Sequence, residues 1–420
     1  MLLKINLQKL DVLILSFLSY VVFIDMINGF FMIEYHKLPI SQTYKIFLLI
    51  LILFRLSFTK DFSIILILLL VFQLGPIQGL VVSGDFSSFV NDVIVSTKWF
   101  NVPLSFFYFK NIFLKGLDQK MTLKIRKFIR SSFKFILLNM LIGFLGFGMA
   151  FYNHGYNNAV GTRGYIFAGN ELTILVLAIG FLIAVYFFEK KNYKKYFFSF
   201  LIFLIISFLI TSKTVLGGVI IIFLIPVISN IRIKFKKKWL NYIVATLTFG
   251  VPMLLFLLSF GILYSGVIDK INYSLQRNNY EIVTVLLSNR NNFLEKGWEV
   301  YTEEFSFLGK LLGYGQNYHL QLSGHLAEID FFSLLFASGI LGLLFLFLLI
   351  FYWFANAIFL KKQHKFIYAK SVLIFLWFIV IAANLSGHIF GSGIAGFFIG
   401  LAIALMFYKN KNDFLVSKNR

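Results

Sequence analysis

The sequence predicts an all-α, polytopic integral membrane protein, organised as one transmembrane domain over residues 1–420. Hydrophobic residues make up 59% of the chain, charged residues only 14%, and the mean hydropathy is +0.84. An ordinary soluble domain carries about 25% charged residues. Apolar runs recur along the whole chain with short interruptions, which indicates a single helical bundle in a membrane. The chain has no cysteine, which excludes disulfides and thiolate metal sites.

Each predicted helix is an apolar run close to the length that crosses the hydrocarbon core of a bilayer. About twelve such runs occur, at 11–33, 40–59, 62–83, 87–109, 128–151, 168–188, 196–212, 214–230, 240–265, 328–354, 366–388 and 391–408. The first run lacks a small-residue cleavage site, so we expect a transmembrane helix there rather than a signal peptide. Asp25, Asp92 and Lys98 lie at membrane depth, where charges are functional candidates.

The basic residues predict the orientation of these helices. Lys and Arg are retained in short cytoplasmic loops, and 29 of the 39 basic residues fall on one side of the twelve-helix arrangement. The main clusters lie at 110–134, 189–195, 232–238, 360–365 and 408–420. We therefore expect this side, with both termini, to be cytoplasmic. The net charge of +21 then reflects topology and contact with anionic lipid, and no nucleic acid is expected as a partner.

The opposite face carries few cations and one long predicted loop. Ten basic residues remain on this face, together with five of the six histidines. The loop 266–327 is its long extracytoplasmic segment and leads into the helix 328–354. A cation on the face that normally avoids positive charge indicates a bound anion.

Two polar clusters precede the long loop. In 161–173, Arg163 lies among glycines, and Asn170 and Glu171 enter the next helix; a solvated loop with an ordinary helix cap is the alternative. In 210–218, Lys213 lies at the outer end of a helix whose dipole attracts anions. A lysine that extends from a helix end to the interface is the alternative there.

The long loop supplies two further cations. Arg290 lies in a Ser-Asn-Arg-Asn-Asn cluster, and Arg277 precedes it. A planar guanidinium can bind two oxygens of a diphosphate and keeps its charge. Surface pairing with neighbouring glutamates is the alternative, and for Arg277 it is the favoured one.

The end of the loop gathers ionisable side chains at the membrane–water boundary. They are His319, His325, Glu328 and Asp330. A histidine there can accept a proton from a sugar hydroxyl, and Glu328 could share a helix face with His325 and orient its imidazole. Helix capping with interfacial hydrogen bonds is the alternative. Glu328 and Asp330 diverge on a helix, which gives little support for a metal site.

The order of these clusters resembles the O-antigen ligase and polymerase superfamily of bacterial envelope assembly. The motifs are Arg163-Gly164 with Ala168-Gly169-Asn170-Glu171-Leu172, Thr211-Ser212-Lys213, Ser288-Asn289-Arg290 with Phe293-Leu294, Gly313-Tyr314-Gly315, and His325 with Glu328, Asp330 and Gly339-Ile340-Leu341-Gly342. They cover 161–342, and the topology covers the whole chain. Lys213 stands where the family commonly has arginine. The Glu-Ile-Asp form after His325 is more similar to the polymerases than to the ligases, which have histidine followed by asparagine.

The resemblance implies a GT-C-like, metal-independent glycosyltransferase of the bacterial cytoplasmic membrane, with no cofactor. It implies a polymerase that joins polyprenyl-diphosphate-linked oligosaccharides of O-antigen, capsule or a related polysaccharide at the outer face. A chain-length regulator and a flippase are candidate protein partners. The candidate catalytic residues are His325, Glu328 and Arg290, with either His325 or Glu328 as the base. The candidate ligands of diphosphate and sugar are Arg163, Lys213, Arg277, Asn170, Glu171, Asp330 and His319.

Two other functions fit parts of the pattern. A ligase would move finished polymer to lipid A-core or another acceptor. A polysaccharide flippase would also have about twelve transmembrane helices, but transporters tend to carry repeated halves with broken helices at matching positions. The two halves of this chain differ, and their polar groups gather on one face, which favours an enzyme.

Overall fold

The computed structural model describes residues 6–35, 38–152, 160–230, 272, 275, 276, 278, 280–363 and 365–409. The first half of this part is helical. Its helices are α1 (Leu7–Leu18), α2 (Val21–Glu34), α3 (Ile40–Leu56), α4 (Phe62–Ser83), α5 (Phe86–Lys115), α6 (Gln119–Phe144), α7 (Gly169–Glu189), α8 (Tyr193–Ile210) and α9 (Lys213–Asn230). Strands β1 (Met149–Tyr152) and β2 (Val160–Gly164) pair antiparallel between α6 and α7.

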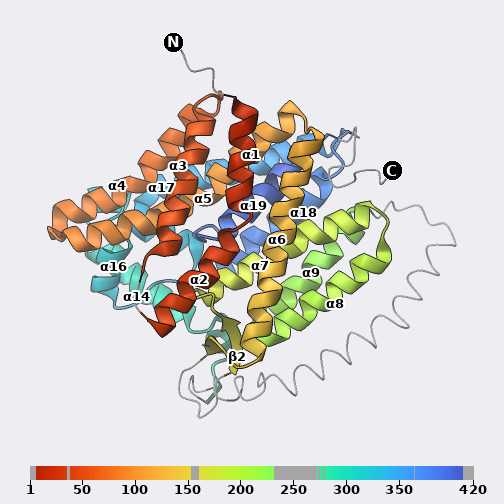
Figure 1. The fold of residues 1–420 in the computed structure, drawn as a ribbon. Helices are drawn as coiled ribbons and strands as arrows, with labels where there is room; N and C mark the ends of the chain where they lie inside the picture. The colour runs from red at the N-terminus through yellow and green to blue at the C-terminus, as the bar shows by residue number, and fades with distance from the viewer. Residues whose placement is uncertain are drawn as a thin grey trace.

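The second half begins with short helices and continues with longer ones. The short helices are α13 (Ile282–Leu287), α14 (Arg290–Glu303), α15 (Phe307–Leu312) and α16 (Gln316–Ser323). The longer ones are α17 (Asp330–Leu360), α18 (Ala369–Leu385) and α19 (Ala395–Ala404), which ends in the 3-10 turn η2 (Leu405–Phe407). Helices α14 and α16 and strand β2 lie at the end of the bundle away from the N-terminus (Figure 1).

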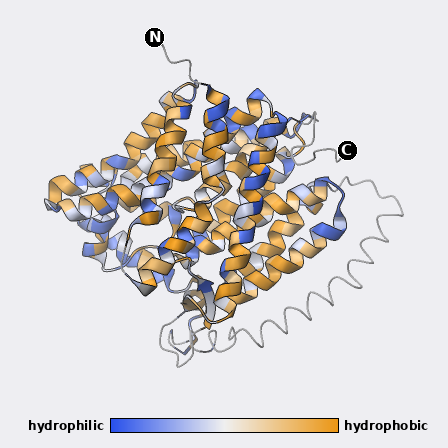
Figure 2. Cartoon of the chain, viewed as in Figure 1, coloured by the Kyte–Doolittle hydropathy of each residue, from blue (hydrophilic) through white to orange (hydrophobic). Residues whose placement is uncertain are grey.

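Six helical segments of the described chain are long and apolar enough to cross a membrane, judged by length and composition. They are Leu7–Ile33, Phe62–Ser83, Gly169–Glu189, Tyr193–Ile210, Lys213–Asn230 and Asp330–Leu360. Ala369–Leu385 and Ala395–Phe407 are apolar but shorter. Apolar residues cover the helices in Figure 2. These features agree with a multi-pass, all-α membrane protein.

Eleven of the twelve predicted ranges overlap helices of the structure. The ranges 40–59, 87–109 and 128–151 correspond to α3, α5 and α6, which are outside the set of six. The prediction of helix to 151 is wrong at its end, because α6 stops at Phe144 and strand β1 begins at Met149. The predicted helix 240–265 lies outside the described residues. The number of twelve transmembrane helices therefore stays a prediction.

Helix α19 lies in the centre of the bundle against α5. Every residue from Ala395 to Ala404 is buried. A Cβ added at Gly400 would lie 2.5 Å from the Cβ of Ser105, which is closer than two side chains can pack. Glycine at this position therefore allows the two helices to touch, and this contact sets the position of the loop that precedes α19.

The predicted loop 266–327 is folded where the structure describes it. Tyr301, Phe305, Tyr314 and Phe336 form a second, smaller core that joins α14–α16 to α17. Asp92 of α5 accepts hydrogen bonds from the backbone nitrogen and Nδ2 of Asn317, at 2.8 and 3.0 Å. This carboxylate therefore holds the start of α16 on α5.

Candidate active site

The structure brings Arg290 and Glu328 together. Nη2 of Arg290 lies 3.3 Å from Oε2 of Glu328, and the arginine side chain is only 11% exposed. Its Nη1 makes a long hydrogen bond of 3.5 Å to the backbone oxygen of Leu385. Its Nε is buried and has no partner among the described residues. A guanidinium that is largely buried and keeps an unused donor is suited to bind an anion.

An apolar groove of about 830 Å³ opens beside Arg290, between α7, α9 and α18. Its walls are mostly hydrophobic side chains such as Ile221, Trp377 and Phe378. Lys213 lines the same groove and donates a hydrogen bond of 2.7 Å to the backbone oxygen of Val285. The apolar groove thus has a hydrophobic body and a cationic end.

Uncharged polar side chains also line the apolar groove. Asn170, in the first turn of α7, is one of them. Another is Tyr152 of β1, whose pKa burial raises to about 12. Its hydroxyl therefore stays protonated at neutral pH. Both residues add neutral hydrogen-bonding groups to the cationic end of the groove.

A polar cleft of about 300 Å³ lies next to the groove. Asn170 lines both the groove and the cleft. Arg290 lines the groove only, and its ion-pair partner Glu328 lines the cleft only. The cleft is also lined by the polar residues Lys98, Glu171, Gln316, Asp330, Ser333 and His388. The Arg290–Glu328 pair therefore stands where the groove and the cleft meet.

Residues 386–394, between α18 and α19, form one wall of this site. Gly387 has a φ of +63°, and a Cβ there would lie 1.9 Å from the backbone oxygen of Glu328. Only glycine combines that conformation with such close approach. The loop is thereby pressed against the segment that carries the catalytic candidate Glu328.

Two predicted sugar ligands hold this loop in place. Oδ2 of Asp330 accepts hydrogen bonds from the backbone nitrogens of Ile389 and Phe390, at 2.9 and 2.7 Å. Oε2 of Glu171 accepts hydrogen bonds from the backbone nitrogens of Gly393 and Ile394, at 2.9 and 3.2 Å. Both carboxylates are buried. They line the cleft, and their hydrogen bonds shape its wall.

The loop also presents His388, which the sequence patterns did not single out as a site residue. His388 has a φ of +58° and a buried Nε2 without a partner among the described residues. Burial lowers the pKa of His388, and the nearby Glu328 opposes this effect. The imidazole is therefore neutral near pH 7 and can accept a proton. The signal in the sequence was Ser-Gly-His-Ile-Phe-Gly-Ser-Gly, a polar, glycine-rich run between two apolar helices.

His325 lies apart from the groove and the cleft. Its exposed imidazole stacks on Phe293 at a centroid distance of 4.6 Å and lines a separate open hollow on α14. The expected helix face shared by His325 and Glu328 does not form, because α17 begins only at Asp330 and Glu328 has a φ of +53°. The structure thus brings Glu328, rather than His325, next to Arg290.

Arg163 and His319, two other predicted ligands, lie elsewhere. Arg163 donates a hydrogen bond of 2.7 Å to the backbone oxygen of Phe167 and covers its ring, and it does not line the groove or the cleft. His319 is buried in the second core and stacks on Phe336 at 4.4 Å. Burial lowers the pKa of His319. Arg277 lies outside the described residues.

Glu328 and Asp330 lie two residues apart in the sequence. Among the described residues, no group of three or more His, Cys, Asp or Glu side chains is placed to hold a metal ion. Asp330 uses its Oδ2 on backbone nitrogens, whereas Glu328 pairs with Arg290. The two carboxylates thus act on different partners.

The helical fold is that of a multi-pass membrane protein, and its apolar groove has cationic side chains at one end. Residues 267–412 match the family model of the O-antigen ligase like membrane proteins. This match confirms the resemblance to the O-antigen ligase and polymerase superfamily. The matched range contains Arg290, Glu328 and the loop of His388. Searches of curated proteins and of solved structures gave no match. The similarity to O-antigen ligase like membrane proteins therefore rests on residues 267–412.

Proposed function

We propose that the protein is a polysaccharide polymerase at the outer face of the bacterial cytoplasmic membrane. It joins one polyprenyl-diphosphate-linked oligosaccharide repeat unit to another. An acceptor hydroxyl oxygen attacks the anomeric carbon of the donor sugar, and the bond from that carbon to the diphosphate oxygen breaks. The polyprenyl diphosphate leaves with the electron pair, and the hydroxyl proton passes to a base of the protein.

The position of Arg290 is the observation that carries this proposal. It lines the apolar groove, keeps a buried donor unused, and bonds to Glu328 at the edge of the polar cleft. The groove can receive the polyprenyl chain in its hydrophobic body and the diphosphate at Arg290 and Lys213. Fixed cations there stabilise the negative charge that develops on the leaving group. The reaction then depends mainly on holding the anion and positioning the acceptor.

Glu328 is the proposed base. It lines the polar cleft, where the acceptor sugar would lie, and its partner Arg290 keeps the carboxylate beside the diphosphate end of the groove. His388 lines the same cleft and is a neutral proton acceptor near pH 7. We assign it a supporting position beside the acceptor. Arg290 and Lys213 supply the positive charge that a divalent cation supplies in other glycosyltransferases, so the proposed reaction needs no metal.

The glycans of a deletion strain distinguish a polymerase from a ligase. A deletion strain should accumulate glycans of a single repeat unit, without the ladder of longer chains, because joining of units has stopped. The wild-type gene on a plasmid should restore the ladder. A ladder that persists on polyprenyl diphosphate in the deletion strain would contradict the polymerase and identify a ligase. The Glu-Ile-Asp form after His325 supports the polymerase.

A further inference from the structure

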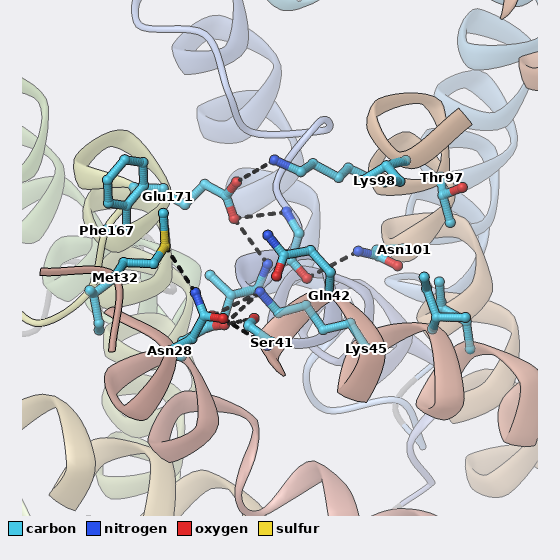
Figure 3. Close-up of a pocket in the computed structure, with 18 of the residues that line it drawn as sticks. Asn28, Met32, Ser41, Gln42, Lys45, Thr97, Lys98, Asn101, Phe167 and Glu171 are labelled. Atoms are coloured by element: carbon cyan, nitrogen blue, oxygen red, sulfur yellow. Dashed lines mark hydrogen bonds and ion pairs between the residues drawn. The ribbon is translucent and has the colours of Figure 1, made fainter. Parts of the chain in front are cut away.

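A further cavity of about 310 Å³, the inner cavity, has Glu171 in its wall but neither Arg290 nor Glu328. It is lined by residues of α2, α3, α5, the segment that leads into α7 and the loop before α19 (Figure 3). Lys98, Ala168 and Glu171 line both the inner cavity and the polar cleft. The two spaces are therefore neighbours, separated by the Lys98–Glu171 pair.

The charges around the inner cavity are balanced. Nζ of Lys45 lies 2.8 Å from Oδ1 of Asp25, and Nζ of Lys98 lies 3.3 Å from Oε1 of Glu171. Ser41 also donates to Asp25. Each lysine thus has a carboxylate partner from another helix, in contrast with the cationic end of the apolar groove. A neutral ligand suits this cavity better than an anion.

The inner cavity nevertheless offers unused hydrogen-bonding groups. Asn101 is only 2% exposed and donates through Nδ2 to the backbone oxygen of Gly393 at 3.0 Å, while its buried Oδ1 has no partner in the described chain. Gln42 extends from α3 into the same space, and its amide makes no hydrogen bond to any described residue. A buried acceptor without a partner is unfavourable unless a ligand or water satisfies it.

Apolar side chains complete the wall. Met32, Ile46, Leu49 and Phe167 line the cavity together with the amides. Ligand sites typically combine an apolar lining with a few directed polar groups and occupy roughly 300–1,000 Å³. A sugar ring has that combined character, because its hydroxyls lie at the edge and its C–H groups on the faces.

We propose that the inner cavity is a subsite for a neutral sugar ring of the acceptor glycan. Asn101 and Gln42 bind its hydroxyls, and the glycan continues past the Lys98–Glu171 pair, which lines both spaces, into the polar cleft. The assignment to the acceptor glycan rests on the proposed function, in which the lipid of the donor fills the apolar groove. The subsite would hold the acceptor in place while its reacting hydroxyl stays beside Glu328.

Binding to the purified full-length protein tests the subsite without relying on activity. One probe is the repeat-unit oligosaccharide released from its lipid by mild acid, and the other is undecaprenyl diphosphate. Gln42→Leu and Asn101→Leu should each weaken oligosaccharide binding by about tenfold or more and leave undecaprenyl diphosphate binding unchanged. Thr43→Val, at an exposed neighbour that does not line the cavity, is the matched control and should change neither.

The outcomes separate this inference from the proposed function. Oligosaccharide binding that is unchanged in both folded variants would overturn the subsite. A loss of both probes in Gln42→Leu, whose exposed side chain gives up no internal hydrogen bond, would overturn it as well. If the deletion strain instead reveals a ligase, a selective loss of oligosaccharide binding in Gln42→Leu would still uphold the cavity as a sugar site.

Discussion

Arg290 and Glu328 form an ion pair of 3.3 Å between the start of α14 and the segment before α17. The arginine belongs to the apolar groove and the glutamate to the polar cleft. One contact therefore links the space suited to a lipid diphosphate with the space suited to an acceptor. The first two predictions test the two halves of this pair.

Arg290→Ala should reduce polymer formation by about a hundredfold or more, the effect of removing a charge-stabilising donor. Arg290→Lys should recover only part of the activity, because the planar fork that binds two oxygens is lost. Gel analysis of glycans from a complemented deletion strain measures both. Membrane fractionation must show normal insertion. Wild-type chain lengths from Arg290→Ala would show that Arg290 acts only as a structural ion-pair partner.

Glu328→Gln should abolish polymer formation while undecaprenyl diphosphate still binds, because the base is removed and the groove keeps its cations. His325→Gln is the comparison. It should leave activity near that of the wild type, since His325 lies on Phe293 outside the cleft. Turnover of lipid-linked repeat units by the purified variants measures the difference. The reverse result, with His325 essential and Glu328 dispensable, would move the base to His325.

Polymer formation by the purified protein should continue in excess EDTA. The reason is that Arg290 and Lys213 already provide the positive charge at the diphosphate end of the groove. Activity is compared with and without the chelator on the same lipid-linked repeat unit. If EDTA stops the reaction and magnesium or manganese restores it, the metal-independent mechanism is wrong and the cleft carboxylates become candidate ligands.

The stability of the protein should fall as the pH drops below about 6.5, the ordinary pKa of histidine. Burial lowers the pKa of both His388 and His319, so the folded protein favours their neutral forms. Below about pH 6.5 the unfolded chain binds more protons than the folded one, and the free energy of unfolding decreases. Above that pH the contribution of both groups is fully present.

Thermal unfolding in detergent between about pH 5.5 and 7.5 measures this dependence. The double variant His388→Asn with His319→Asn should have a flatter profile than the wild type. Asparagine is suitable at position 388 because it tolerates the positive φ found there. Equal stability of the wild-type protein at both ends of this range would rule out the effect.

Some of the ionisable site residues could be predicted from the sequence. Arg290, Lys213 and Glu328 could be selected because charges on the sparsely charged face of a membrane protein are few. The two basic residues also predict an anion site. The spacing of three residues predicts that His325 and Glu328 share one face of a helix. The helix begins only at Asp330, so this prediction is wrong. A separation of three residues is informative only where the helix exists.

Hydropathy determined the helices of this protein, because a segment that crosses a bilayer must be apolar along its own length and satisfies its backbone hydrogen bonds internally. That requirement is local, so the sequence alone reveals it. Only the tertiary structure decided which charges meet. Glu171 and Asp330 accept hydrogen bonds from backbone nitrogens of the loop before α19. His388 and Glu328 line the same cleft. Apolar helices carry little information about their neighbours, since packing against one another depends on the shapes of side chains from distant parts of the chain.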